Sequence, residues 1–153
     1  MALLGSSVNI ITSDGPAGRL GYTATAVSSV CDTPPSLLIC MNRSSQQNEP
    51  LKENGVFCVN VLSSRHQDLS AAFAGVGKME MPERFRMGDW ERLLTGAPAL
   101  VGAVVSFDCR IAQVVEVGTH SLIIADVVAL RQDHAVNGLV YFDRKYHELK
   151  LGA

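Results

Sequence analysis

The sequence predicts a mainly β protein with short helices, arranged as a small antiparallel barrel. Three observations carry this prediction. β-branched residues are concentrated in short runs separated by turn signals, as along residues 8–12 and 23–27. Helical spacing of apolar residues is confined to short excursions, and there is no internal repeat. About six or seven strands with so little helix are typical of a small barrel.

Composition limits the class of protein further. The 153 residues are 47% hydrophobic and 18% charged, which is enough for one folded domain over residues 1–153. The net charge of −2 argues against binding to nucleic acid or to an anionic membrane. The mean hydropathy of +0.17 is high for a monomer, and we expect a buried subunit interface.

Targeting signals and metal-binding patterns are absent from the sequence. No apolar run approaches the roughly 18 residues of a membrane span, and the start has no basic region before an apolar stretch. The cysteines form no CxxC pair, and no zinc-like spacing occurs. Cys40, Cys58 and Cys109 lie in apolar runs, which predicts buried thiols in a reducing cytoplasm.

The first third of the sequence predicts strands. Residues 7–30 predict two strands around a turn at Asp14-Gly15-Pro16. Residues 32–35, with two prolines, predict a rigid corner. The apolar run 36–42 predicts a strand buried on both faces.

The remainder mixes short helices with strands. Residues 49–53 predict a helix of one or two turns, stopped at Asn54-Gly55, and 55–62 predict a strand. Ser63-Ser64 resembles an N-cap before a helix over 65–75, and 78–98 predict a long irregular segment. Two strands, a turn at 117–120 and another strand follow over 99–133. Residues 138–149 predict one last strand.

The first candidate binding segment is the small, hydroxyl-rich stretch at residues 23–29. It contains Thr23, Ala24, Thr25, Ala26, Ser28 and Ser29. Such small side chains leave the backbone accessible to a flat ligand. The alternative is an edge strand with one polar face, where threonine is common.

The second candidate segment follows the apolar strand 36–42. Asn42, Arg43, Ser44, Ser45 and Asn48 precede or open a helix. Backbone amides at a helix start and an arginine together suit a phosphate. The alternative is a solvated capping loop. The loop contains no glycine, so an ATP-binding loop is not predicted.

Two further segments carry histidine and aromatic residues. His120 lies in the Gly-Thr-His turn, where it either binds a ligand ring or is simply exposed. Tyr146 and His147 lie in an aromatic, basic stretch that either forms a ligand wall or packs its tyrosines inward. No paired carboxylates, Ser/His/Asp set or metal triad is recognisable, which fits chemistry carried by a bound cofactor.

Several segments taken in order resemble the short-chain flavin reductase family over residues 4–149. They are GYTATAVSSVCDTPPSLLICMNRSS, GVFCVNVL, the GTH turn and GLVYFDRKYHEL. Members of this family are the reductase components of two-component flavin monooxygenases. The nearest in pattern are the reductases of 4-hydroxyphenylacetate 3-monooxygenase and of the pyrimidine-degrading monooxygenase, together with a corrin reductase.

The resemblance implies a six-stranded, Greek-key split β-barrel of the FMN-binding type, acting as a cytoplasmic homodimer. It implies that NADH or NADPH reduces FMN or FAD, and that reduced flavin passes to a flavin-dependent monooxygenase or another acceptor. Carried over, Thr23 to Ala26 match the strand at the flavin ring, and Ser28 and Ser29 lie near the ring and ribityl chain. Asn42, Arg43, Ser44, Ser45 and Asn48 match the ribityl and phosphate loop. His120, Tyr146 and His147 match the nicotinamide side.

Two alternatives remain open at this level. One is a flavoprotein that keeps its FMN and reduces a corrinoid or another acceptor. The other is a non-catalytic module that binds flavin or pyridoxal phosphate. Relatives usually carry a helix ahead of the segment matching residues 2–12, so we expect the contact with the partner subunit to differ here.

Overall fold

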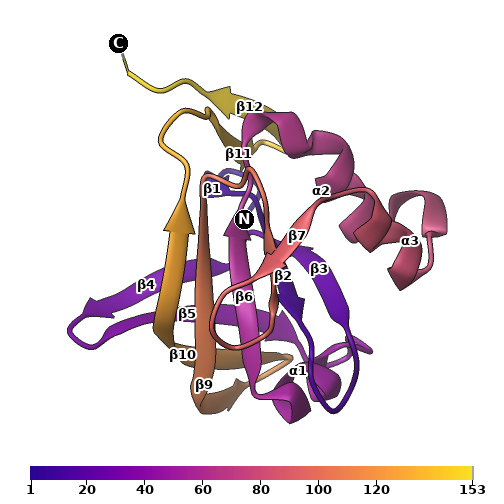
Figure 1. Ribbon diagram of the computed structural model, residues 1–153, viewed down its shortest axis with the longest axis vertical. Helices are drawn as coiled ribbons and strands as arrows, with labels where there is room; N and C mark the ends of the chain where they lie inside the picture. Colours follow the sequence, from indigo (N-terminus) through magenta and orange to yellow (C-terminus); the bar gives the residue numbers. More distant parts are fainter. Residues whose placement is uncertain (153) are drawn as a thin grey trace.

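The computed structural model describes residues 1–152 and is built mainly from antiparallel sheet (Figure 1). The largest sheet has seven strands in the order β3-β2-β6-β9-β10-β5-β4. These strands are β2 (Asn9–Ser13), β3 (Leu20–Ala24), β4 (Val27–Asp32), β5 (Pro35–Asn42), β6 (Val56–Val61), β9 (Val105–Val117) and β10 (His120–Gln132). Over the described residues, β3 and β4 are unpaired edges. The predicted mainly β class is confirmed, but this sheet does not close into a barrel.

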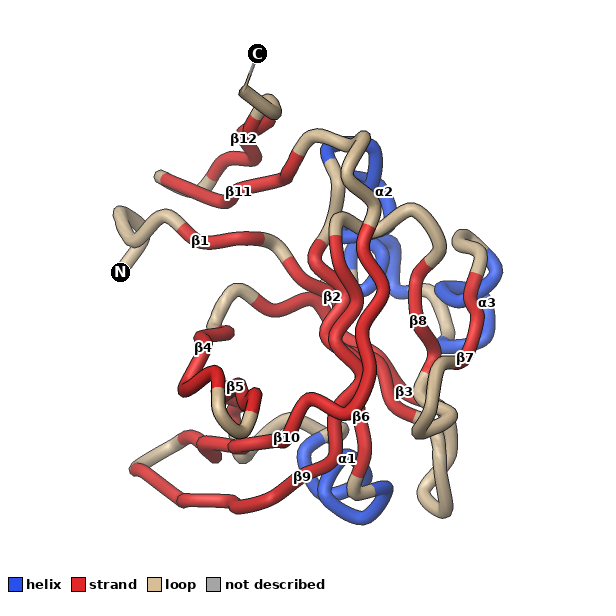
Figure 2. Tube along the Cα trace, turned by 60° about the vertical axis from the view of Figure 1, so that its left-hand side comes forward, coloured by secondary structure: helices blue, strands red, loops and turns tan. Residues whose placement is uncertain are grey.

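The long β9–β10 hairpin bends the large sheet. Residues 105–110 of β9 pair with β6, whereas residues 120–126 of β10 pair with β5. Register shifts between Ile124 and Ala125 and between Val127 and Ala129 mark bulges, which bend and twist a strand. The hairpin thereby carries the sheet from the β2–β6 layer round to β5 and β4, as Figure 2 shows.

Segments from the two ends of the chain form a small sheet, which differs from one prediction. It consists of β1 (Ser6–Ser7), β11 (Gly138–Phe142) and β12 (Lys145–Leu149), in the order β1-β11-β12. The prediction of a single strand over 138–149 is therefore wrong. The chain reverses at Asp143 and Arg144, whose φ angles are +49° and +60°. This left-handed turn contains no glycine or proline that would have announced it.

The first segment also contains more strands than predicted. Residues 7–30 were expected to form two strands, and they contribute to β1, β2, β3 and β4. The break between β3 and β4 lies at Thr25-Ala26, where the Val27 N–H donates to the Thr25 carbonyl at 2.9 Å. The predicted corner at residues 32–35 is confirmed as the connection between β4 and β5.

Three short α-helices cover parts of the sheet, and two of them were predicted. α1 (Asn48–Asn54) ends at Gly55, which has a φ of 71°. A 3₁₀ turn, Ser64–His66, leads into α2 (Gln67–Phe73), and Ser63 caps this turn as predicted. The segment 78–98 is not simply irregular, because it contains α3 (Met81–Arg86) and β7 (Trp90–Arg92), which pairs with β8 (Pro98–Leu100). Within residues 1–152, no helix is both long enough and apolar enough to cross a bilayer.

The core has two parts, one on each face of β2. Ile11 packs with Ile39, Phe57 and Ile123 on one face. Ile10 packs on the other face, in a cluster that also holds Phe73, Phe85 and Leu100. Neighbouring residues of a strand point to opposite faces, so every residue of β2 is buried. Cys58 and Cys109 are buried as predicted, whereas Cys40 is only partly buried.

Candidate functional site

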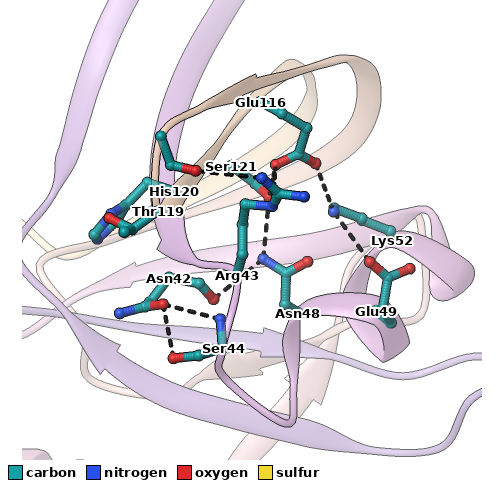
Figure 3. A network of polar contacts seen from close by, with 11 residues as sticks. Asn42, Arg43, Ser44, Asn48, Glu49, Lys52, Glu116, Thr119, His120 and Ser121 are labelled. Atoms are coloured by element: carbon teal, nitrogen blue, oxygen red, sulfur yellow. Dashed lines mark hydrogen bonds and ion pairs between the residues drawn. The ribbon is translucent and has the colours of Figure 1, made fainter.

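The connection from β5 to α1 is held rigidly by its own amide side chains (Figure 3). The Asn42 side-chain oxygen accepts hydrogen bonds from the Ser44 backbone N–H at 2.9 Å and from the Ser44 hydroxyl at 2.8 Å. The buried Asn48 amide donates to the Asn42 carbonyl at 3.3 Å and to the Ser121 hydroxyl at 3.2 Å. The predicted loop is thereby fixed against β10.

Arg43 lies on the side of this loop that faces the β9–β10 turn. Its Nε is 3.3 Å from a Glu116 carboxylate oxygen, and its Nη1 donates to the Gly118 carbonyl at 3.2 Å. Hydrogen bonds from Lys52 and then Ser121 lower the pKa of Glu116, so this carboxylate stays charged. Arg43 lines an open cavity of about 560 Å³. Its role as a phosphate ligand remains a prediction, since the guanidinium already has two acceptors.

Ser45 faces a different cavity, of about 520 Å³, and this cavity holds cations that sequence reasoning missed. Ser45, Gln46 and Gln47 form one side of it, and Lys78 and Arg84 contribute from the segment after α2. Glu80 also lines it. Over residues 1–152, neither Lys78 nor Arg84 forms an ion pair. The only sequence signal for them was the high charge of residues 78–98.

Two side-chain oxygens at the start of α1, Gln47 Oε1 and Asn48 Oδ1, are buried without a donor. Of these two residues, Gln47 lines the cavity, whereas Asn48 is enclosed between Asn42 and Ser121. The cavity therefore places the polar side chains of Ser45 and Gln47 next to two cations, an arrangement that suits a ligand with both hydroxyl and phosphate groups.

A third, smaller cavity of about 170 Å³ brings together residues from both ends of the chain. It is lined by Val8, Thr23, Thr25, Ala74, Tyr141 and Tyr146. Thr23 on β3 and Tyr146 on β12 were both predicted site residues, and the fold places them around one space. Ala74 lines this cavity and the next residue, Gly75, lines the cationic one, so the two spaces adjoin at the end of α2.

The other predicted residues lie outside these two adjoining cavities. Ala24 packs against the core, and the Ala26 carbonyl accepts the Cys40 N–H at 3.0 Å. Ser28 and Ser29 are exposed on the edge strand β4. This placement on a sheet edge matches the alternative interpretation of that segment.

The two predicted histidines are exposed and lie apart. His147 bonds to the Phe142 carbonyl at 3.1 Å and packs on the Phe142 ring. His120 opens β10 opposite Asn42, with its Nδ1 2.8 Å from the Thr119 hydroxyl. The β12 strand lies at one end of the molecule and α1, beside Asn42, at the other (Figure 1). Within one protomer the fold therefore separates His120 from Tyr146.

Comparison with known proteins identifies the family to which this fold belongs. The family described as "Flavin reductase like domain" matches residues 1–150. The chain belongs to this family.

Individual relatives point the same way. The chain is 54% identical over 149 residues to the FMN reductase (NADH) RutF of Serratia proteamaculans, covering 97% of this chain and 84% of that protein. Its fold matches a putative flavin reductase from Haemophilus somnus with a TM-score of 0.93 and 42% identity, covering 97% and 94% of the two chains. It also matches the styrene monooxygenase flavin reductase of Pseudomonas putida S12, with a TM-score of 0.84, 26% identity and coverage of 99% and 96%.

Proposed function

We propose that this chain is an NADH-dependent FMN reductase that catalyses NADH + FMN + H⁺ → NAD⁺ + FMNH₂. The observation that carries the proposal is the cationic cavity of Lys78 and Arg84, with the polar side chains of Ser45 and Gln47 in its lining. FMN has a phosphate and a hydroxylated ribityl chain, which are the two groups that this arrangement suits. The names of close relatives, as NADH-dependent FMN reductases, support the same substrate pair.

The residues divide into three roles. Lys78, Arg84 and the Ser45 hydroxyl bind the phosphate by charge and hydrogen bonding. Gln47, which lines the cavity, contacts the ribityl hydroxyls, and Asn48 holds the loop in place through Asn42 and Ser121. The bound flavin supplies the hydride acceptor.

The adjoining small cavity is where the flavin and nicotinamide rings meet. The strand end at Thr23 and Thr25 forms one side and Tyr146 forms the other, so the chain holds the nicotinamide against the flavin. Holding two reactants in register removes much of the entropic barrier without an acid or base from the protein.

The remaining predicted contacts stay within this proposal. The resemblance implies that Ala24, Ala26, Ser28 and Ser29 contact the ring, Asn42, Arg43 and Ser44 the phosphate side, and His120 and His147 the nicotinamide. These residues lie outside the two cavities of one protomer, so their contacts stay predictions. FAD and NADPH are alternative substrates for the same cavities.

We also infer a split β-barrel of the Greek-key type, a homodimer and a cytoplasmic location. The curled, open seven-stranded sheet supports the barrel type. Exposed valines on β4 and β9 support the dimer. Reduced FMN then passes to a flavin-dependent monooxygenase, a partner supported by the styrene monooxygenase reductase among the structural matches.

The phosphate assignment is tested by comparing FMN with riboflavin, which lacks the phosphate. We expect Arg84→Ala to weaken FMN binding by about 10- to 150-fold, the effect of losing a charge-assisted hydrogen bond, and to leave riboflavin binding unchanged. Quenching of flavin fluorescence measures both dissociation constants. Arg86→Ala, an exposed arginine two residues further along the chain, is the matched control. Equal losses for FMN and riboflavin would contradict the assignment.

Activity and colour together test the reaction itself. We expect rapid oxidation of NADH only when FMN is added, and a colourless protein after gel filtration. A protein that stays yellow supports the alternative of an FMN-retaining flavoprotein, which passes electrons to a corrinoid or another acceptor. Absence of any NADH oxidation with FMN would refute the proposal.

A further inference from the structure

Ser70 connects the two walls of the small cavity without lining it. It lies within α2 and is fully buried. Its hydroxyl is 2.9 Å from the Tyr146 hydroxyl on β12. Its carbonyl accepts a hydrogen bond from the Thr23 hydroxyl on β3 at 2.6 Å. One residue thus touches two of the side chains that line the cavity.

The Ser70 hydroxyl contacts a side chain outside its own helix. A serine inside a helix commonly bonds back to a carbonyl of its own preceding turn. Here the Ser70 hydroxyl is directed instead to a side chain 76 residues further along the chain. The Ser70 hydroxyl therefore connects helix α2 to strand β12.

Tyr146 needs such a contact because its strand is weakly held. Over residues 1–152, β12 pairs as a strand only with β11, at the edge of a three-stranded sheet. The Tyr146 ring packs edge-on against Tyr141, with centroids 5.4 Å apart, and this contact does not fix the position of its hydroxyl. The hydrogen bond to Ser70 ties the outer wall of the cavity to the buried helix.

We propose that Ser70 is a positioning residue for hydride transfer. It holds Tyr146 so that the tyrosine ring stays against the nicotinamide, while Thr23 keeps the opposite wall in place. This inference rests on the proposed NADH:FMN reductase function, because it concerns the cavity assigned there to the rings. It assigns to α2 a role in binding the nicotinamide and none in binding the FMN phosphate.

The test compares two buried serines. We expect Ser70→Ala to lower kcat/KM for NADH by about 3- to 10-fold, the effect of losing one neutral hydrogen bond. The dissociation constant of FMN should stay within about twofold, because Ser70 does not line the phosphate cavity. Ser106→Ala is the control: Ser106 is also fully buried and donates to the Asn60 side chain at 2.8 Å, away from the cavity. It should lower stability without changing kcat/KM.

Three more variants separate an effect on positioning from an effect on folding. Tyr146→Phe removes the same hydrogen bond from its more accessible end and should reproduce the kinetic loss. The double variant Ser70→Ala with Tyr146→Phe should be no worse than the poorer single variant, because both changes remove one interaction. Ser70→Thr keeps the hydroxyl and should restore most of kcat/KM.

Calorimetric binding of NAD⁺ to the FMN-loaded protein gives a readout that needs no turnover. A weaker affinity for NAD⁺ in Ser70→Ala, with no change in Ser106→Ala, supports the inference even if the wild type fails to oxidise NADH, which would count against the proposed function alone. The inference is overturned if Ser70→Ala behaves like Ser106→Ala in both kcat/KM and NAD⁺ affinity. It is overturned equally if the wild type binds no NAD⁺.

Discussion

At the scale of single residues, His66 makes the stability of the turn before α2 sensitive to pH. Its Nδ1 accepts hydrogen bonds from the Ser63 backbone N–H at 3.2 Å and from the Ser63 hydroxyl, 3.1 Å away. Both bonds require a neutral ring with Nδ1 unprotonated. Burial, and then the charge of Arg65, lower the pKa of His66, so the folded protein favours this neutral form.

A depressed histidine pKa predicts a loss of stability in acid. The unfolded chain, with an ordinary histidine pKa near 6.5, binds the proton more readily than the folded chain does. The contribution of His66 is therefore fully present above about pH 6.5 and is lost as the pH falls through the lower, folded value. Thermal unfolding of the wild type between pH 5 and 8 should show this decline.

His66→Gln is the variant that isolates this effect. Glutamine at this position keeps a side-chain acceptor for the Ser63 N–H but does not titrate. We expect a flatter dependence of the melting temperature on pH below about 6.5 in the variant. A pH dependence identical to that of the wild type would assign the acid sensitivity to other groups.

At the scale of elements, the residues predicted to contact the nicotinamide lie on two different hairpins. The β9–β10 hairpin carries His120 at its turn, and the β11–β12 hairpin carries Tyr146. His120 lies opposite Asn42, near α1, and α1 and β12 lie at opposite ends of the molecule (Figure 1). The Arg43–Glu116 ion pair and the hydrogen bond from Arg43 to Gly118 hold the first hairpin to the loop after β5. Each hairpin is thus anchored to a different part of the proposed flavin site.

Substitution of His120 tests which of the two hairpins contacts the nicotinamide. If His120 contacts the nicotinamide, His120→Ala lowers kcat/KM for NADH by about 10- to 100-fold and leaves FMN affinity unchanged. Stopped-flow bleaching of FMN with excess NADH measures the step directly. Thr119→Ala removes the hydroxyl that contacts His120 Nδ1 and so tests whether the position of the His120 ring matters. An unaltered rate in His120→Ala would make His120 an exposed turn residue and leave the nicotinamide to the cavity at Tyr146.

At the scale of the whole molecule, apolar residues are exposed on two strands of the large sheet. Val30 on β4 is 50% exposed, and Val117 on β9 is 55% exposed. Val114 and Val115 on β9 are also exposed. Apolar surface of this kind is typical of a face covered by a partner subunit, and the mean hydropathy of +0.17 points the same way.

The proposed dimer is tested by placing a charge on this surface. We expect the wild type to have the mass of a dimer by light scattering at micromolar concentration, and Val115→Lys to shift it toward the monomer, because a buried unpaired charge is costly. Leu94→Lys changes an equally apolar and 62% exposed residue outside β4 and β9, and should keep the dimer mass. A monomeric wild type in the presence of FMN would rule the dimer out.

The features that were predicted correctly from the sequence are local ones. The helix end at Gly55, the cap at Ser63, and the corner at residues 32–35 were all predicted, because backbone preferences of glycine, serine and proline act over a few residues. The turn at Asp143 and Arg144 was missed, because both residues take left-handed angles without a glycine to signal it. Ser45, Asn48, Thr23 and Tyr146 were singled out from sequence as well.

Contacts between distant segments set which of these residues lie together. Lys78 and Arg84 join Ser45 across more than thirty positions of sequence, and Ser70 joins Thr23 to Tyr146 through α2. No local pattern encodes such contacts, since they arise when buried faces of separate elements pack against each other. The same packing separated His120 from Tyr146 and directed Arg43 to Glu116. Single candidate residues were thus visible in the sequence, whereas the cations Lys78 and Arg84 and the grouping of residues into cavities depended on long-range packing.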